Sequence, residues 1–171
     1  MKIKDLMTPV ERYQTLGLDA SLSDVVNAIH DGAHRDILVV DDTGAFAGVV
    51  TMIDIIIALE PNYKKLNTND LGSDILSNRF VADQFKEYNL WSNTLTDLCG
   101  KSLDLKARDL MHVPEDSHYI DENSDLEHGV HLYIMGATQP LIVRQNGTVT
   151  GILRMADVFD EIINRMSTCA D

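Results

Sequence analysis

The sequence predicts a mixed α/β (α+β) protein in which two β-α-β-β-α repeats pack as a pseudo-symmetric pair with a helical insert between them. The main observation is a duplication: GAFAGVVTMIDI at residues 44–55 returns as GTVTGILRMADV at residues 147–158, 103 positions later. An internal repeat identifies the folding unit before any residue propensity is considered. A second observation extends the duplication, because the apolar positions of an upstream segment recur at a spacing of 104: Leu22, Val26 and Ile29 match Leu126, Val130 and Tyr133.

The first repeat, residues 1–59, predicts the order strand, helix, strand, strand, helix. Ser21 and Asp24 have the spacing of a capping box, which indicates a helix start, and Gly32 is a suitable end. The continuous apolar run that follows is typical of a buried strand, and the turn residues after it indicate a hairpin. The other expected elements are an extended stretch at 14–18, strands at 37–40 and 46–50, a turn at 41–44 and a helix at 51–59.

The second repeat, residues 106–171, predicts the same order of elements. Its opening Leu110-Met111 matches Leu6-Met7, and its buried strand is expected at residues 141–143. Asn146-Gly147 is a strong signal for a two-residue hairpin turn. We expect the last helix to cover residues 157–163.

The insert, residues 60–105, is unrelated to either repeat. Apolar residues near helical spacing predict a helix over 79–99, and Trp91, the only tryptophan, lies within it. Two interpretations are open for the insert. It is either an extra helical layer that covers the core, which we favour, or a lid or partner-binding surface.

Composition and charge exclude several classes of function. The net charge is −13 and is spread along the chain, so no basic patch is available to bind a nucleic-acid backbone, and an anionic lipid surface is also disfavoured. No apolar stretch reaches the roughly 18 residues of a membrane-spanning helix, and the first residues lack the apolar core of a signal peptide. Cys99 and Cys169 are far apart in sequence and are typical of reduced thiols, which indicates a cytoplasmic protein.

Two sets of motifs follow one another in the same order: Asp5-Leu6-Met7-Thr8-Pro9, Leu38-Val39-Val40-Asp41 and residues 48–54, then Asp109-Leu110-Met111, Leu141-Ile142-Val143 and residues 151–157. Together these motifs resemble those of a tandem CBS-domain protein, also called a Bateman module, over about two-thirds of the chain. The resemblance implies two units packed through their sheets, with clefts that bind adenosine compounds: AMP, ADP or ATP, with S-adenosylmethionine as a further candidate. It also implies a flat homodimer that senses a ligand for a regulated protein, here unknown, and that is not an enzyme.

In that family, a Thr or Ser followed three residues later by Asp contacts the nucleotide, and here the pair is Thr51 and Asp54. The resemblance implies that Asp54 accepts hydrogen bonds from the ribose hydroxyls, and an ionised acceptor makes the stronger hydrogen bonds. The start of the adjacent helix offers free N–H groups to phosphate oxygens. The alternative is that the two residues only cap the helix.

The second repeat departs from this pattern, because Arg154 stands where the first repeat has Thr51, although Asp157 is kept. Arg154 is suited to bind a phosphate with two hydrogen bonds, or to form an ion pair with an acidic group. The two expected clefts therefore need not bind the same ligand, and the cleft of Thr51 and Asp54 is the better candidate for a nucleotide site.

Two further features complete the candidate site. His34 and Arg35 precede a buried strand at the place where relatives carry phosphate-binding basic residues, although Asp36 intervenes; a solvated turn is the equal alternative. Thr15 and Leu16 match an early strand that borders the adenine in the family, and core packing is the other interpretation of Leu16.

No catalytic constellation is present in the sequence: there is no P-loop, nucleophile elbow or zinc-protease motif. Glu127, His128 and His131 lack further ligands at a recognised spacing, so we interpret them as a polar helix face. The leading hypothesis is a stand-alone regulatory module that binds an adenosine nucleotide and signals by a conformational shift. The alternative is a protein–protein interaction or dimerisation module without a ligand.

Overall fold

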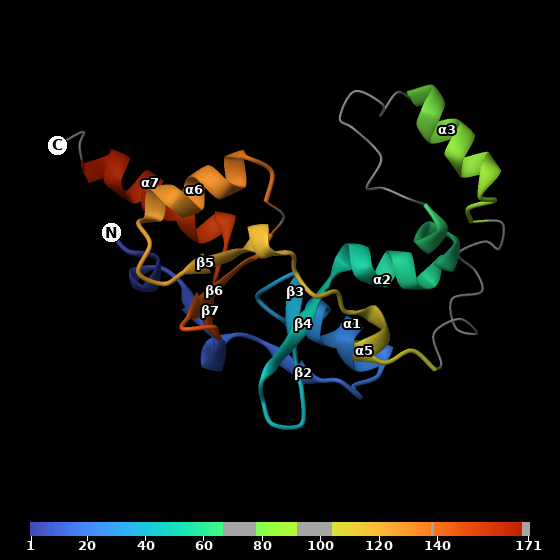
Figure 1. Ribbon diagram of the computed structural model, residues 1–171, viewed down its shortest axis with the longest axis horizontal. Coiled ribbons are helices and arrows are strands. Elements are labelled where there is room, and N and C mark those ends of the chain that lie inside the picture. The colour runs from blue at the N-terminus through green and yellow to red at the C-terminus, as the bar shows by residue number, and fades with distance from the viewer. Residues whose placement is uncertain (67–77, 92–103, 138, 169–171) are drawn as a thin grey trace.

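The computed structural model describes residues 1–66, 78–91, 104–137 and 139–168, and it confirms the mixed α+β fold with its two repeats (Figure 1). One sheet has three strands in the order β2-β3-β4 and the other has four in the order β1-β7-β6-β5. The strands are β1 (Thr8–Pro9), β2 (Thr15–Gly17), β3 (Asp36–Val40), β4 (Phe46–Thr51), β5 (Tyr119–Asp121), β6 (Leu141–Gln145) and β7 (Thr148–Leu153). The helices are α1 (Leu22–Asp31), α2 (Met52–Leu59), α3 (Asn78–Glu87), α5 (Ala107–Leu110), α6 (Leu126–Ile134) and α7 (Met155–Thr168).

Local sequence signals explain the main elements. Ser21 caps α1, because its hydroxyl accepts a hydrogen bond from the Asp24 N–H at 3.1 Å and the Asp24 carboxylate accepts one from the Ser21 N–H at 2.9 Å. Asn146 and Gly147 both have positive φ angles, of 51° and 83°, as a type I′ hairpin turn requires. The last helix is longer than the expected 157–163, since α7 covers Met155–Thr168. No helix of the described part of the chain is both long and apolar enough to cross a membrane.

The two repeats have the same strand register. The first strand of each sheet hairpin pairs with a matched glycine, Val39 with Gly48 and Val143 with Gly151, and a register irregularity follows at the same point in both. A Cβ atom on Gly48 would lie 2.8 Å from the His112 carbonyl oxygen, and one on Gly151 would lie 2.8 Å from the Thr8 carbonyl oxygen. Glycine is therefore required at both positions because another segment of backbone crosses there.

The crossing segment comes from the opposite repeat. In the four-stranded sheet, β1 pairs with β7, so that Thr8 lies opposite Ile152. The matched contact in the other repeat is an antiparallel bridge between Val49 and His112, with both N–H···O distances at 3.0 Å. The opening segment of each sequence repeat thus packs with the other repeat, which the sequence comparison alone does not reveal.

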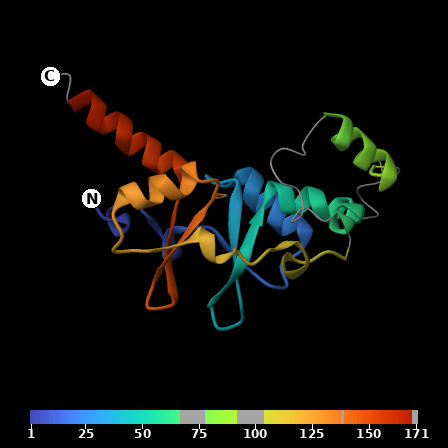
Figure 2. The same cartoon turned by 45° about the horizontal axis from the view of Figure 1, so that its top comes forward.

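The hydrophobic core follows this exchange. Ile3, which is fully buried, packs with residues of β6, β7 and α6, whereas Ala107 and Leu110 of the second repeat pack against α1 and β3. A third cluster joins the two sheets, and Figure 2 shows the sheets side by side with the longer helices along one side. This central cluster consists of Tyr13, Leu38, Val49, Ile142 and Ile152.

The predicted helix over 79–99 is wrong at residues 88–91. The described helix α3 ends at Glu87, because the turn that follows places Asn89 and Trp91 at positive φ angles of 52° and 53°; residues 92–99 lie outside the described part. The α3 helix lies beyond the end of α2 and away from both sheets (Figures 1 and 2), so it does not form a layer over the core. The buried Glu60 carboxylate accepts a hydrogen bond from the Trp91 N–H at 2.9 Å and so connects the turn to the end of α2.

Candidate functional site

Thr51 and Asp54 lie where β4 ends and α2 begins. Thr51 has an extended backbone and serves as the N-cap, and its N–H and hydroxyl both donate to Asp54 Oδ2 at 2.7 Å. The Asp54 N–H lies 3.4 Å from the Thr51 hydroxyl oxygen in return. The helix-capping role of the pair is therefore present in the structure. The other carboxylate oxygen, Oδ1, is not used by the cap.

His112, which the sequence did not single out, contacts this carboxylate from the second repeat. Its Nδ1 lies 3.0 Å from both Oδ1 and Oδ2 of Asp54, and the Val49–His112 bridge holds its backbone in place. The hydrogen bond to Asp54 outweighs burial and raises the pKa of His112 above its ordinary value of 6.5. Burial raises the pKa of Asp54, but the hydrogen bonds from His112 and Thr51 outweigh it and hold that pKa below its usual range.

This pair has a pH dependence whose sign follows from the raised pKa of His112. The contact contributes its full stability below pH 6.5 and loses it as the pH rises through the pKa of His112 in the folded protein. We expect His112→Gln to lower the free energy of unfolding more at about pH 5.5 than at about pH 8.5 in urea denaturation. The control is the same substitution in an Asp54→Asn background, where the pH dependence should disappear. An equal loss of unfolding free energy at both pH values would contradict a raised pKa of His112 in the folded protein.

The second repeat arranges its matched residues differently. Arg154 donates from Nε to Asp157 Oδ2 at 2.8 Å and from a second nitrogen to the other carboxylate oxygen, so the ion pair is bidentate. The two side chains are largely buried, with 25% and 18% of their surfaces exposed. Of the two interpretations of Arg154, the structure shows the ion pair, and its partner is Asp157. The carboxylate that matches Asp54 is therefore already occupied by a cation of the same chain.

His34 contacts Arg154 of the second repeat and not Asp54. Its Nδ1 accepts a hydrogen bond from Arg154, and its ring stacks on Tyr13 with centroids 4.5 Å apart and planes 14° apart. Burial lowers the pKa of His34, and Arg154 lowers it further, so the ring stays neutral and can accept this bond. The Tyr13 hydroxyl donates to Asp36, whose pKa is raised by burial despite that bond. Residues of both repeats thus form one polar cluster.

The remaining candidate residues do not converge on the Asp54 carboxylate. Arg35 donates to the Ile29 carbonyl at 3.0 Å, at the end of α1, and lines a small apolar groove beside Met52. Thr15 is exposed on β2 and lies opposite Leu38. Leu16 packs against the core of the first repeat, as the alternative interpretation of it expected. Among the described residues, no group of three His, Cys, Asp or Glu side chains is arranged to hold a metal ion.

Of the contacts that the sequence did not predict, only that of His112 has a signal in the repeat, and it is weak. His112 follows the matched pair Leu110-Met111 and therefore corresponds to Thr8 at the 104-residue spacing. Since Gly48 and Gly151 both receive a crossing backbone, a search for what crosses at each glycine would have led to His112. Tyr13 and Asp36 carry no such signal, because their contact depends on how β2 and β3 pair.

Comparisons with known proteins give the family of the first repeat and the fold of the whole. The family model of the CBS domain matches residues 3–61. No curated protein sequence matches the chain significantly.

Solved structures match almost the full length of the chain. CBSX2 in complex with AMP shares 20% identity and a TM-score of 0.62, covering 95% of this chain and 97% of that one. A CBS domain-containing protein of unknown function from Bacillus anthracis str. Ames Ancestor shares 13% identity and a TM-score of 0.61, covering 96% and 94%. The CBS domain of a bacterial CNNM/CorC family Mg²⁺ transporter, in complex with the inhibitor IGN95a, shares 16% identity and a TM-score of 0.58, covering 95% and 76%. The family match identifies residues 3–61 as a CBS domain, and the matches to solved structures give the described chain the fold of CBS-domain proteins.

Proposed function

We propose that the protein is a regulatory module, and not an enzyme, that binds an adenosine nucleotide of the AMP, ADP or ATP class in the cleft beside Thr51 and Asp54. The observation that carries the proposal is the contact between Asp54 at the start of α2 and His112 of the second repeat. A ligand that takes this carboxylate must compete with a contact that joins the two repeats. The complex of CBSX2 with AMP, a protein of the same fold, supports the class of ligand.

The chemistry of the cleft suits a ribose. Asp54 Oδ2 is held by the Thr51 cap, whereas Oδ1 faces only His112 among the described residues. Two vicinal hydroxyls would donate to this ionised carboxylate and displace the imidazole, and charge-assisted bonds of this kind are the stronger ones. The displaced His112 would lose the contact that raises its pKa, but its ring N–H would be available to donate to a phosphate, beside the N–H groups at the start of α2.

Binding would signal through a shift in how the two repeats sit together. A ligand changes a conformational equilibrium only through different affinities for the two states. Here the difference would come from the Asp54–His112 contact, which is made in the ligand-free arrangement and broken by the ribose. A regulated partner, whose identity is unknown, would recognise the new arrangement.

The ion pair of the second cleft supports one nucleotide per chain. Arg154 donates to both oxygens of Asp157, so the hydroxyls of a ribose would have to compete with the guanidinium for this carboxylate. His34 and Tyr13 stack beside it and close the cleft further. Any ligand would have to break a largely buried bidentate ion pair before it could reach Asp157.

We expect Asp54→Asn to weaken binding of AMP, ADP or ATP at least about tenfold, because the ionised acceptor becomes a neutral amide of the same shape. Isothermal titration calorimetry measures the affinity, with S-adenosylmethionine as a fourth ligand. The matched control is Asp157→Asn, which changes the equivalent residue of the second repeat and should leave the affinity within about twofold. Affinity unchanged by Asp54→Asn for every ligand that binds the wild type would contradict the proposed role.

The second candidate function is a protein–protein interaction module without a ligand. The pairing of both candidate carboxylates within the chain favours it. Asp54 and Asp157 both have partners within the chain, so neither needs a ligand for its charge to be compensated. No heat signal with any of the four ligands would favour this candidate over the first.

We also propose that two copies form a homodimer. The helices α2 and α7 expose apolar side chains that the described residues of one chain leave uncovered, and such patches mark interaction surfaces. These side chains are Met52, Ile53 and Ile56 on α2 and Phe159, Ile162, Ile163 and Met166 on α7. A second copy of the chain would cover them with a matching apolar face.

A further inference from the structure

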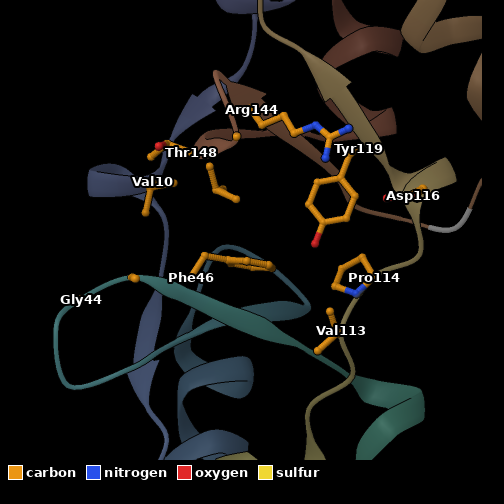
Figure 3. A pocket seen from close by; sticks show the side chains of 12 residues that line it. Val10, Gly44, Phe46, Val113, Pro114, Asp116, Tyr119, Arg144 and Thr148 are labelled. Atoms are coloured by element: carbon orange, nitrogen blue, oxygen red, sulfur yellow. The ribbon is translucent and has the colours of Figure 1, made fainter.

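A cavity of about 560 Å³ lies between the tips of the two hairpins, β3–β4 and β6–β7, and is separate from the Asp54 cleft (Figure 3). Phe46 lines it at the beginning of β4, whereas Thr51 stands at the other end of that strand, about 16 Å away for five residues of extended chain. Its volume lies within the range of small-molecule sites. From its lining we infer that this cavity binds a small planar organic anion, such as an aromatic carboxylate.

Matched positions of both repeats build the cavity. Gly44 and Phe46 of the first hairpin correspond to Gly147 and Val149 of the second at the 103-residue spacing, and all four line the cavity. The cavity therefore lies on the local two-fold relation between the repeats. Any occupant would touch both hairpins at once, so its binding would depend on how the two repeats are arranged.

The apolar walls suit a planar group. In Figure 3 the ring of Phe46 lies across the cavity from Tyr119, and Pro114 closes the side between them. The Tyr119 hydroxyl points into the space between Phe46 and Pro114 (Figure 3). Burial raises the pKa of Tyr119, so this hydroxyl keeps its proton and can donate a hydrogen bond to an occupant. Aromatic faces with one polar end are typical of sites for flat ligands.

The charge of the occupant follows from Arg144. Its guanidinium carbon lies 4.9 Å from the centroid of the Tyr119 ring, which fixes the group at the cavity wall. Within the described residues Arg144 forms no ion pair, as is also true of Arg12 and Arg35, whereas Arg79, Arg108, Arg154 and Arg165 each pair with a carboxylate. In a protein of net charge −13, a cation that lines a cavity and forms no ion pair favours an anionic occupant.

Asp116 lines the same cavity and sets a test of the sign of this charge. Its carboxylate opposes an anionic occupant and would favour a cationic one. Two substitutions of exposed side chains therefore have opposite expected effects: Arg144→Gln should weaken the binding of an anion about tenfold, and Asp116→Asn should strengthen it about threefold. If instead Arg144→Gln strengthened the binding of the anion and Asp116→Asn weakened it, the cavity would not favour an anion and the inference would be overturned.

The probe is 2-naphthoate, titrated into ¹⁵N-labelled protein, with neutral 2-naphthamide and cationic 2-naphthylmethylammonium as comparison compounds. We expect 2-naphthoate to shift the backbone amide signals of Phe46 and Thr148 and to bind about tenfold more tightly than the amide. The spectra of both variants also show directly that the fold is kept. Failure to shift these signals at about 5 mM 2-naphthoate, or equal affinity for all three compounds, would overturn the inference.

A further arm separates this site from the nucleotide cleft. Asp54→Asn should leave the binding of 2-naphthoate unchanged, since Asp54 does not line the cavity. Loss of 2-naphthoate binding in this variant would place the probe in the nucleotide cleft and overturn the inference. If 2-naphthoate shifts the amide signals of Phe46 and Thr148, the inference holds even when no nucleotide binds the wild type. The two proposals can therefore fail independently.

Discussion

Gly48→Ala is expected to lower the free energy of unfolding by about 2–4 kcal/mol, through overpacking against a backbone atom that cannot move alone. The new Cβ would lie 2.8 Å from the His112 carbonyl oxygen and 3.0 Å from the Met111 sulfur. The opening segment of the second repeat would have to move away from β4. Both backbone hydrogen bonds between Val49 and His112, each 3.0 Å long, would then weaken together. Chemical denaturation measures the loss.

Gly17→Ala is the matched control for this prediction. Gly17 also lies on a strand of the first repeat, but a Cβ there meets no atom within 4 Å and its φ angle is not positive. We expect this variant to be neutral or more stable by up to about 1 kcal/mol, because alanine has less freedom in the unfolded chain. If both variants lost the same stability, the exchange of opening segments would not be the cause.

Arg154→Thr is expected to raise the number of nucleotides bound per chain from one to two, with the new site within about tenfold of the affinity of the first. The substitution gives the second repeat the residue that the first carries at Thr51, and it frees both oxygens of Asp157. It also removes the contact of Arg154 with His34, so that the ring can move out of the cleft. Calorimetry gives the stoichiometry directly. This prediction depends on the proposed nucleotide function.

The control for the second site is the double variant Arg154→Thr with Asp157→Asn. It should return the stoichiometry to one while the original site keeps its affinity, because Asp54 is untouched. A folded Arg154→Thr variant that still binds a single nucleotide would show that the ion pair is not what closes the second cleft. Arg154→Lys is a further comparison, since its single ammonium group cannot make the bidentate contact.

Both predictions depend on one consequence of the fold. The opening segment of each repeat packs against the other repeat. The side-chain contacts of the candidate site therefore join parts of the chain that are distant in sequence. Asp54 and His112 are 58 positions apart, and Arg154 and His34 are 120 apart. A ligand in either cleft would therefore act on contacts between the repeats and not within one of them.

The elements that depend on neighbouring residues were predictable from the sequence. The Ser21–Asp24 capping box starts α1, and Asn146-Gly147 forms the tight turn of the second hairpin. The helix predicted over 79–99 was wrong at residues 88–91, because the backbone turns at Asn89 and Trp91 although the apolar spacing continues there. The spacing of apolar residues indicates only a helical period, whereas the contacts of Trp91 with Glu60 and Tyr63 determine where the chain turns.

The candidate site was predictable only in part. Thr51, Asp54, Arg154 and Asp157 lie at matched positions, as a comparison of the two repeats indicates. Their partners were not, since a pattern within one segment says nothing about the side chain that another segment brings to it. His112 beside Asp54 is the clearest example.

The sequence by itself determined that one unit is used twice, the order of its strands and helices, and the caps and turns that bound them, because these depend on residues a few positions apart. Only the tertiary structure decided that the opening segments are exchanged, that His112 contacts Asp54, and that Arg154 pairs with Asp157. These outcomes depend on which backbones approach closely enough to require Gly48 and Gly151, and close approach is a property of packing in three dimensions.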